Sequence, residues 1–140
     1  MDGPTRQLFE AARSAQSQAH CPYSGYPVGA AVRSASGRIY TGCNVENASY
    51  PEGTCAETGA IAAMVLDGER SIQMVLTVTD GATPGTPCGG CRQRIREFAD
   101  DSTIVVATTA DGEMLTMSMD ELLPSSFGPE RLSRRDTPRS

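Results

Sequence analysis

The chain has 140 residues and a mass of 14.8 kDa, with 12 Arg, no Lys and 17 acidic residues, so its formal net charge is −5. The absence of Lys excludes a Schiff-base mechanism and a P-loop, and the single His20 excludes a metal site built from several imidazoles. Residues 131–140 carry four Arg against one Asp, or +3, so residues 1–130 carry −8, which disfavours nucleic acid as a partner.

The length suits one domain over residues 1–130, followed by a basic tail over 131–140 that we expect to be disordered. No apolar run reaches the roughly 20 residues that span a bilayer, and no basic start precedes a hydrophobic stretch. We therefore expect a cytoplasmic protein with no membrane partner. Its five Cys are then expected to be reduced, metal-bound or catalytic rather than disulfide-bonded.

The hydrophobic pattern predicts alternating helices and strands, beginning with a helix on which apolar residues recur at helical spacing. The predicted helices cover 4–19, 54–66, 91–99 and 118–123. The predicted strands cover 28–32, 38–43, 72–79, 103–108 and 113–117, with a Gly- and Pro-rich loop over 81–90. This order predicts an α/β fold with three layers, in which helices cover both faces of a mixed five-stranded sheet.

Three cysteines fall at the starts of two predicted helices. Cys55 lies in the first turn of the second helix, and Cys88 and Cys91 form a Pro-Cys-Gly-Gly-Cys motif at the start of the third. Helix N-termini stabilise thiolates, and a Cys-x-x-Cys pair brings two sulfur atoms to one side of a metal ion. Three thiolates leave the fourth position of Zn²⁺ open, as in catalytic zinc sites.

Glu57, two residues after Cys55, is placed to move protons at such a metal without binding it. An alternative is structural, because Thr54 and Glu57 also fit a capping box, in which each side chain satisfies a backbone donor at the helix start. The cysteines around them favour the catalytic interpretation, since a cap alone requires no Cys.

The pattern Cys-Ala-Glu followed by Pro-Cys-Gly-Gly-Cys resembles the zinc-dependent nucleoside and nucleobase deaminases. Over roughly residues 5–130 the chain is similar to the cytidine deaminase family of the small homotetrameric type. The further motifs that carry this resemblance are CPYSGYPVGAA (21–31), GCNVENASYP (42–51), CRQ (91–93) and LLPSSFGP (122–129).

The resemblance implies a cytidine-deaminase-like fold, one Zn²⁺ per subunit held by Cys55, Cys88 and Cys91, and Glu57 as the catalytic acid and base. The implied reaction is hydrolysis of cytidine and 2′-deoxycytidine to uridine and 2′-deoxyuridine with release of ammonia, in pyrimidine salvage. The implied partners are a small nucleoside and further copies of the chain, with a homotetramer expected.

The resemblance also implies how substrate is held. Asn44 and Glu46 would hydrogen-bond the ribose 3′-hydroxyl, and the backbone of Ala56 and Pro87 would contact the amide edge of the ring and the leaving amine. Three aromatic residues would complete the pocket, with the last two contributed by neighbouring subunits: Tyr26, Tyr50 and Phe127.

Two positions depart from the family pattern. The family usually has Arg after Cys-Ala-Glu, where it offsets thiolate charge, and this chain has Thr58, so we expect Arg92 to take over part of that role. Tyr26 stands where the family generally has Phe, and its hydroxyl needs a partner, which leaves the preferred nucleoside open.

Two alternatives to this function stay open. One is a deaminase of a modified cytosine nucleoside or nucleoside antibiotic, although Asn44 and Glu46 suit a ribose. The other is a structural zinc module for protein interaction, in which Cys43 joins Cys55, Cys88 and Cys91 as a fourth ligand.

Overall fold

A five-stranded mixed sheet forms the middle layer of the computed structural model, which describes residues 1–132. The strands are β1 (Val28–Ser34), β2 (Ile39–Cys43), β3 (Ile72–Thr79), β4 (Ile104–Thr109) and β5 (Met114–Ser118). Their order is β2-β1-β3-β4-β5, and only β3 and β4 run parallel. The predicted α/β fold and its five strands are confirmed, with boundaries that differ by one or two residues.

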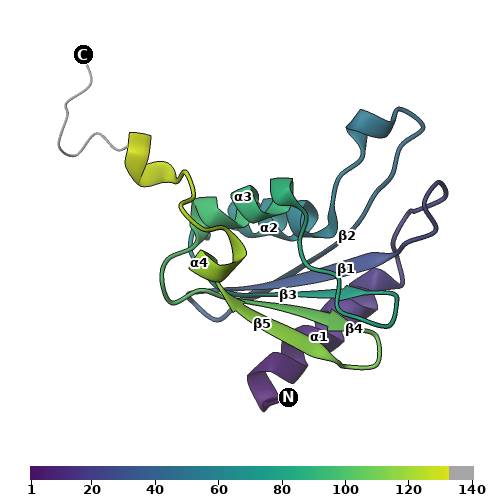
Figure 1. Ribbon diagram of the computed structural model, residues 1–140, viewed down its shortest axis with the longest axis horizontal. Coiled ribbons are helices and arrows are strands. Elements are labelled where there is room, and N and C mark those ends of the chain that lie inside the picture. The colour runs from purple at the N-terminus through teal and green to yellow at the C-terminus, as the bar shows by residue number, and fades with distance from the viewer. Residues whose placement is uncertain (133–140) are drawn as a thin grey trace.

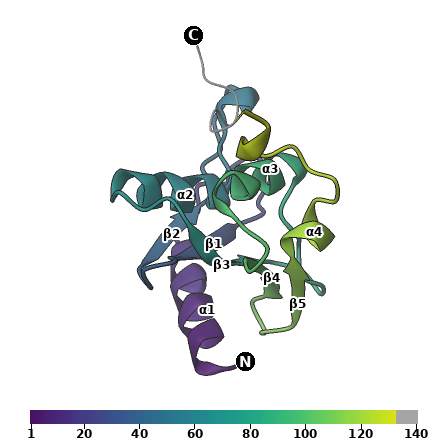
Figure 2. The ribbon, with the colours of Figure 1, turned by 90° about the vertical axis from the view of Figure 1, so that its left-hand side faces the viewer.

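The helices lie on both faces of this sheet (Figures 1 and 2). They are α1 (Gly3–Gln16), α2 (Ala56–Leu66), α3 (Gly89–Phe98) and α4 (Met119–Leu122), with short 3₁₀ turns at Tyr50–Glu52 and Pro129–Leu132. Figure 2 shows α1 on one face and α2 and α3 on the other. Within residues 1–132, no helix is both long and apolar enough to cross a bilayer.

Alternating side chains of the strands fill two separate cores, as expected for a sheet that is covered on both faces. On β1, Ala31 packs with Leu8 and Ala12 of α1. Its neighbours Ala30 and Val32 belong to the core on the opposite face. Because β3 and β4 are covered on both sides, they are apolar along most of their length.

The first helix is shorter than predicted. Asp2 caps its start by accepting a hydrogen bond from Thr5 N at 2.8 Å, but the helix ends at Gln16 rather than at residue 19. There the Gln16 amide donates to Pro27 O and to Asp80 Oδ1, both at 3.1 Å. The chain then turns so that His20 pairs with Val45 beside the end of β2.

The parallel pair β3 and β4 places the starts of two helices at the same end of the sheet. Helix α2 runs back toward the start of β3, and α3 leaves from the end of β3 and crosses over to β4. The N-termini of α2 and α3 therefore both lie near the carboxyl end of β3, where ligands of α/β proteins commonly bind.

Candidate active site

The three predicted cysteine ligands meet at these two helix starts. Cys55 is the N-cap of α2, Cys88 is the N-cap of α3, and Cys91 lies in the first turn of α3. Their sulfur atoms all lie within 4.8 Å of one another, and Cys55 Sγ is 3.8 Å from Cys88 Sγ. Two thiolates on one tetrahedral zinc at about 2.3 Å each lie about 3.8 Å apart, so the donor set fits Zn²⁺.

The surroundings of the three thiols differ. Burial raises the pKa of the Cys55 and Cys91 thiols, whereas a backbone hydrogen bond from Cys91 lowers the pKa of the Cys88 thiol. Metal binding requires the thiolate form of each sulfur atom, so it acts against the effect of burial at Cys55 and Cys91.

The alternative of a structural four-cysteine zinc module lacks its fourth ligand. Among residues 1–132, the group that could hold a metal consists of Cys55, Cys88 and Cys91 and does not include Cys43. Cys43 instead ends β2, where it pairs with Gly29 of β1.

Glu57 is buried beside the cysteines, with 4% of its surface exposed. Burial raises the pKa of its carboxyl, although the charge of Arg94 acts in the opposite direction. The capping-box alternative is not found, because Cys55 rather than Thr54 is the N-cap and no side chain caps α2. Thr54 instead pairs through its backbone with Val45.

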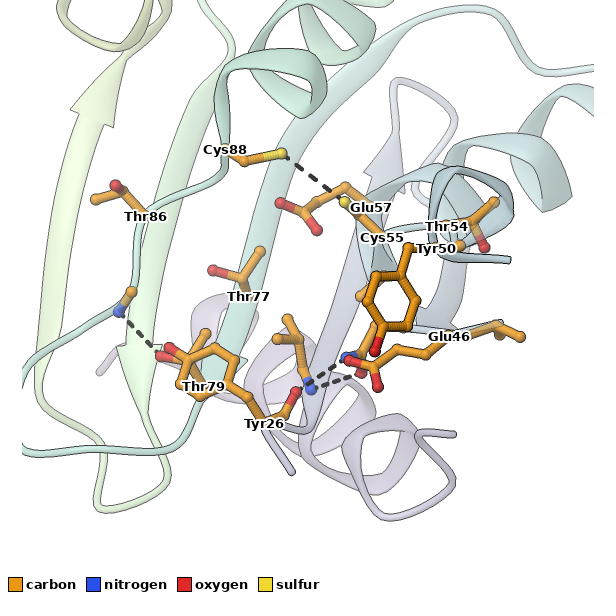
Figure 3. A pocket seen from close by; sticks show the side chains of 16 residues that line it. Tyr26, Glu46, Tyr50, Thr54, Cys55, Glu57, Thr77, Thr79, Thr86 and Cys88 are labelled. Carbon is orange, nitrogen blue, oxygen red and sulfur yellow. Dashed lines mark hydrogen bonds between the residues drawn. The ribbon is translucent and has the colours of Figure 1, made fainter. Parts of the chain in front are cut away.

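A cavity of about 340 Å³ opens beside Glu57, within the range of small-molecule sites. Figure 3 shows Cys55, Glu57 and Cys88 together at one end and Tyr26 and Glu46 at the other. The sequence-predicted residues that line the cavity are Tyr26, Asn44, Glu46, Tyr50, Cys55, Ala56, Glu57 and Cys88. Pro87 and Phe127 are not among the lining residues.

Asn44 and Glu46 are held in place by the loop that follows α1. Asn44 Oδ1 accepts from Val28 N and its Nδ2 donates to Tyr26 O, both at 2.9 Å. Glu46 Oε1 accepts from Tyr23 N at 2.9 Å and Oε2 accepts from the Ser24 hydroxyl, and the bonds from Ser24 lower the pKa of the Glu46 carboxyl. Both side chains are thus fixed at the cavity wall before any ligand binds.

The loop before α3 forms one side of the cavity, where Gly85 packs closely against Tyr26 and Thr79. A Cβ atom at Gly85 would lie 2.7 Å from the Tyr26 hydroxyl and 2.9 Å from Thr79 Oγ1. Gly85 N donates to Thr79 Oγ1 at 2.9 Å, which ties the loop to the end of β3. A side chain at this position would push the loop away from Tyr26.

The cavity is also lined by residues that were not among the predicted site residues: Val28, Val45, Gly53, Thr54, Thr77, Thr79, Gly85 and Thr86. Thr77 is 1% exposed, and its Oγ1 atom has no hydrogen-bond partner. The sequence signal for Thr77 and Thr79 is a pair of hydroxyls at alternating positions of a mostly apolar strand, which places both side chains on one face of β3.

Tyr50 and Phe127, which were expected from neighbouring subunits, are both exposed, at 74% and 56%. Tyr50 lines the cavity of its own chain and packs against Tyr23, with ring centroids 5.4 Å apart. The Phe127 carbonyl accepts a hydrogen bond from Gln93 Nε2 at 2.8 Å. A contribution of either ring to a neighbouring subunit stays a prediction.

Arg92 does not occupy the position that we expected beside a thiolate. Its guanidinium donates to Pro87 O at 2.8 Å, to Leu122 O at 2.7 Å and to Thr86 Oγ1 at 3.0 Å. Arg94, two residues further along α3, lies beside the metal site instead, with Nη1 3.8 Å from Cys91 Sγ. The correction follows from the helix rotation of about 100° per residue, which separates the directions of Arg92 and Arg94 by about 200°.

Comparison with known proteins places this site in a family. The model of the "Cytidine and deoxycytidylate deaminase zinc-binding region" matches residues 4–108. A cytidine deaminase of Sporosarcina psychrophila is 42% identical over 127 residues, which cover 91% of this chain and 93% of the relative.

Solved structures give the same result. The crystal structure of cytidine deaminase from Burkholderia pseudomallei is 37% identical, with a TM-score of 0.84, and covers 91% of this chain and 100% of that chain. That of Mycobacterium tuberculosis cytidine deaminase is 32% identical, with a TM-score of 0.78 and coverage of 91% and 99%. The family model, the relatives and the three-cysteine site agree, and the chain belongs to the cytidine and deoxycytidylate deaminase family.

Proposed function

We propose that the protein catalyses the zinc-dependent hydrolysis of cytidine and 2′-deoxycytidine to uridine and 2′-deoxyuridine, with release of ammonia. The observation that carries the proposal is the buried Glu57 carboxyl next to three clustered cysteine sulfur atoms, at one end of a cavity of about 340 Å³. The relatives of similar length are cytidine deaminases, which supports the choice of substrate.

Cys55, Cys88 and Cys91 would hold one Zn²⁺ per subunit, and zinc supplies a Lewis acid that makes water a stronger acid. Glu57, in its ionised form, accepts a proton from the attacking water. It would deliver this proton to N3 of the pyrimidine. It would then take the second proton from the hydroxyl newly bonded to C4 and pass it to the departing amine, so that ammonia leaves and the C4 carbonyl forms. Its raised pKa suits both roles, because a proton carrier works best when its pKa approaches the working pH.

The rest of the cavity would position the nucleoside. The backbone of Ala56 and Pro87 would hold the amide edge of the ring and the leaving amine, and the ring of Tyr26 would lie against the pyrimidine. The Glu46 carboxylate would accept a hydrogen bond from the ribose 3′-hydroxyl, and the Asn44 amide would hydrogen-bond the same hydroxyl. Their fixed positions favour binding, because little side-chain freedom is lost when substrate enters.

We further propose a homotetramer that acts in pyrimidine salvage in the cytoplasm. The support is the exposure of Tyr50 and Phe127, since large exposed aromatic residues are enriched at interfaces. In such an assembly, each cavity would be completed by Tyr50 and Phe127 of neighbouring copies.

A second candidate substrate is a modified cytosine nucleoside. It is favoured by two hydroxyls at the cavity, because Thr77 Oγ1 has no partner and the Tyr26 hydroxyl lies against Gly85. A polar substituent on the pyrimidine could bond to either group, whereas cytidine carries none at carbon 5.

The test is an ultraviolet assay of cytidine, 2′-deoxycytidine, cytosine and cytosine nucleosides with a polar 5-substituent, with zinc measured in the same sample. We expect turnover of the first two and none of free cytosine. Glu57→Gln should keep its zinc and lose activity by a factor of about 10²–10⁴. Zinc-loaded protein that leaves both nucleosides unchanged, or an active Glu57→Gln variant, would contradict the proposal.

A further inference from the structure

A cation lies against the most buried of the three cysteines. Arg94 Nη1 is 3.8 Å from the sulfur of Cys91, which has no exposed surface. Among residues 1–132, the salt bridges are formed by Arg38 and Arg96, so Arg94 has no carboxylate within salt-bridge distance.

Gly90 leaves room for the Arg94 guanidinium. A Cβ atom at Gly90 would lie 3.1 Å from Arg94 Nη1, closer than most Cβ contacts. Gly90 stands between Cys88 and Cys91, so the Cys-Gly-Gly-Cys motif leaves room for the guanidinium as well as for the turn of the backbone. Another residue at this position would push Arg94 away from the sulfur.

Helix α2 has no basic residue that could place a second positive charge beside the three cysteines. Thr58 and Arg94 both line a hollow between α2 and α3, with a volume of about 410 Å³. The Thr58 hydroxyl is buried and has no hydrogen-bond partner. The positive charge at this hollow therefore comes from α3.

Three thiolates and one Zn²⁺ sum to a net charge of −1, and at Cys91 this charge is shielded from water. An uncompensated charge in a buried site is unfavourable, and groups that bond to metal ligands tune both metal affinity and reactivity. We propose that Arg94 is a positioning residue that offsets the net negative charge of the metal site through Cys91. The inference rests on the zinc site of the proposed function.

Arg92 serves a different purpose. Its hydrogen bonds to Pro87, Thr86 and Leu122 tie the loop before α3 to the end of α4. Arg92 and Arg94 of α3 thus have different roles, since Arg92 holds the loop and Arg94 faces the cysteine site.

The experiment compares zinc-loaded wild type with Arg94→Ala, Arg94→Gln, Arg94→Lys and the double variant Arg94→Ala/Thr58→Arg. Arg13→Ala, on the exposed side of α1 across the sheet, is the matched control for the loss of one positive charge. The first readout is the rate of zinc release to a coloured chelator without substrate. The second readout is the thiolate-to-cobalt absorption band of the protein loaded with Co²⁺. The third is kcat and KM for cytidine.

We expect Arg94→Ala and Arg94→Gln to release zinc about 10–100 times faster than wild type and to shift the cobalt band. Their kcat should fall by a similar factor while KM changes less. Lys at position 94 should recover part of the loss, because it restores the charge. Thr58→Arg should also recover part of it, because it returns a cation to the same hollow from α2. Arg13→Ala should match wild type.

The proposal is overturned if Arg94→Gln releases zinc at the wild-type rate with an unchanged cobalt spectrum. It is also overturned if Arg13→Ala loses zinc as fast as Arg94→Ala, because a global charge effect would then explain the result. A protein that binds zinc tightly but deaminates no nucleoside would sink the proposed function. In that case the zinc-release and cobalt measurements still decide the role of Arg94.

Discussion

Two polar side chains of the cavity, Glu57 and Thr77, are buried at a cost in folding free energy. Burial raises the pKa of Glu57, and Thr77 Oγ1 lacks a hydrogen-bond partner. Both cost folding free energy, as is common where a site must be ready for a ligand rather than fully satisfied by its own chain. The stability of variants at these two positions therefore reports on the site independently of turnover.

The Glu57 carboxyl is expected to make stability depend on pH. Because its folded-state pKa is raised above 4.5, the folded protein binds this proton more tightly than the unfolded chain does. Its stabilising contribution is complete below pH 4.5 and is lost as the pH rises through the folded-state pKa. Glu57→Gln should thus raise the free energy of unfolding of the metal-free protein at pH 7 by on the order of 1 kcal/mol. Urea titrations at several pH values measure this.

Glu121→Gln is the control with the opposite sign. Hydrogen bonds from Ser118 lower the pKa of the Glu121 carboxyl, so its contribution is present above the ordinary pKa and is lost as the pH falls. The substitution should lower stability at pH 7 and have less effect in acid. A Glu57→Gln gain that persists below pH 4 would contradict the assignment.

Thr77→Val should raise the free energy of unfolding by about 1 kcal/mol, because Val has nearly the same shape and removes an unsatisfied hydroxyl. Thr108→Val is the matched comparison on the adjacent strand β4. Its hydroxyl donates to Thr77 O at 2.8 Å, so this variant should lose about 1 kcal/mol. Urea unfolding of both zinc-loaded variants tests the pair, and equal destabilisation would show that Thr77 Oγ1 is satisfied.

At the scale of elements, the metal site depends on how closely α2 approaches the sheet. A Cβ atom at Gly42 of β2 would lie 2.4 Å from Ala56 O and 2.5 Å from Ala60 N, which are both backbone atoms. Ala56 directly follows Cys55, which is a predicted zinc ligand. The contact between β2 and α2 therefore also sets how far Cys55 lies from the sheet.

Gly42→Ala should therefore destabilise the protein by about 1–3 kcal/mol through overpacking, and it should speed zinc release. The matched control is Gly59→Ala on α2. A Cβ atom at Gly59 would meet Gly42 Cα at 3.5 Å, an ordinary contact, so this change should stabilise the helix by about 0.5–1 kcal/mol. Chemical denaturation and chelator kinetics of the two variants measure the effects. Gly42→Ala with wild-type stability would mean that α2 can move without cost.

At the scale of the whole molecule, large apolar residues are exposed around the mouth of the cavity. Tyr23, Val45 and Tyr50 are 50%, 48% and 74% exposed there, and Phe127, which does not line the cavity, is 56% exposed. Such a concentration is typical of an interaction surface. It is consistent with the proposed assembly, in which copies of the chain cover these residues.

Mixing two inactive variants tests that assembly. If Phe127 acts in the neighbouring copy, Phe127→Ala should lose activity, and so should Glu57→Gln. Refolding the two together should restore activity at about a quarter of the sites, because each functional site needs Glu57 from one copy and Phe127 from another. Sedimentation of the same samples gives the oligomeric state. A fully active monomer, or no recovery in the mixture, would contradict the prediction.

Much of the fold follows from the sequence, because helices and strands have different hydrophobic periods and Gly and Pro mark their ends. The strand at Ile72–Thr79 was predicted to the residue. The end of α1 was placed three residues too late, since Gln16 forms tertiary bonds to Pro27 and Asp80 that no local pattern encodes. The basic segment predicted to be disordered lies mostly outside the described residues, 1–132.

The sequence by itself was enough to predict which three cysteines lie together, because Cys88 and Cys91 are held together by local helix geometry and Cys55 marks the start of a second helix. Only the tertiary structure decided which arginine faces that site and which hydroxyls line the cavity. Arg94 rather than Arg92 lies against Cys91, and Thr77 is unpartnered beside Glu57. The physical reason is that side-chain direction depends on how α3 is rotated against α2 and how both helices sit on β3, and these contacts join residues far apart in the chain.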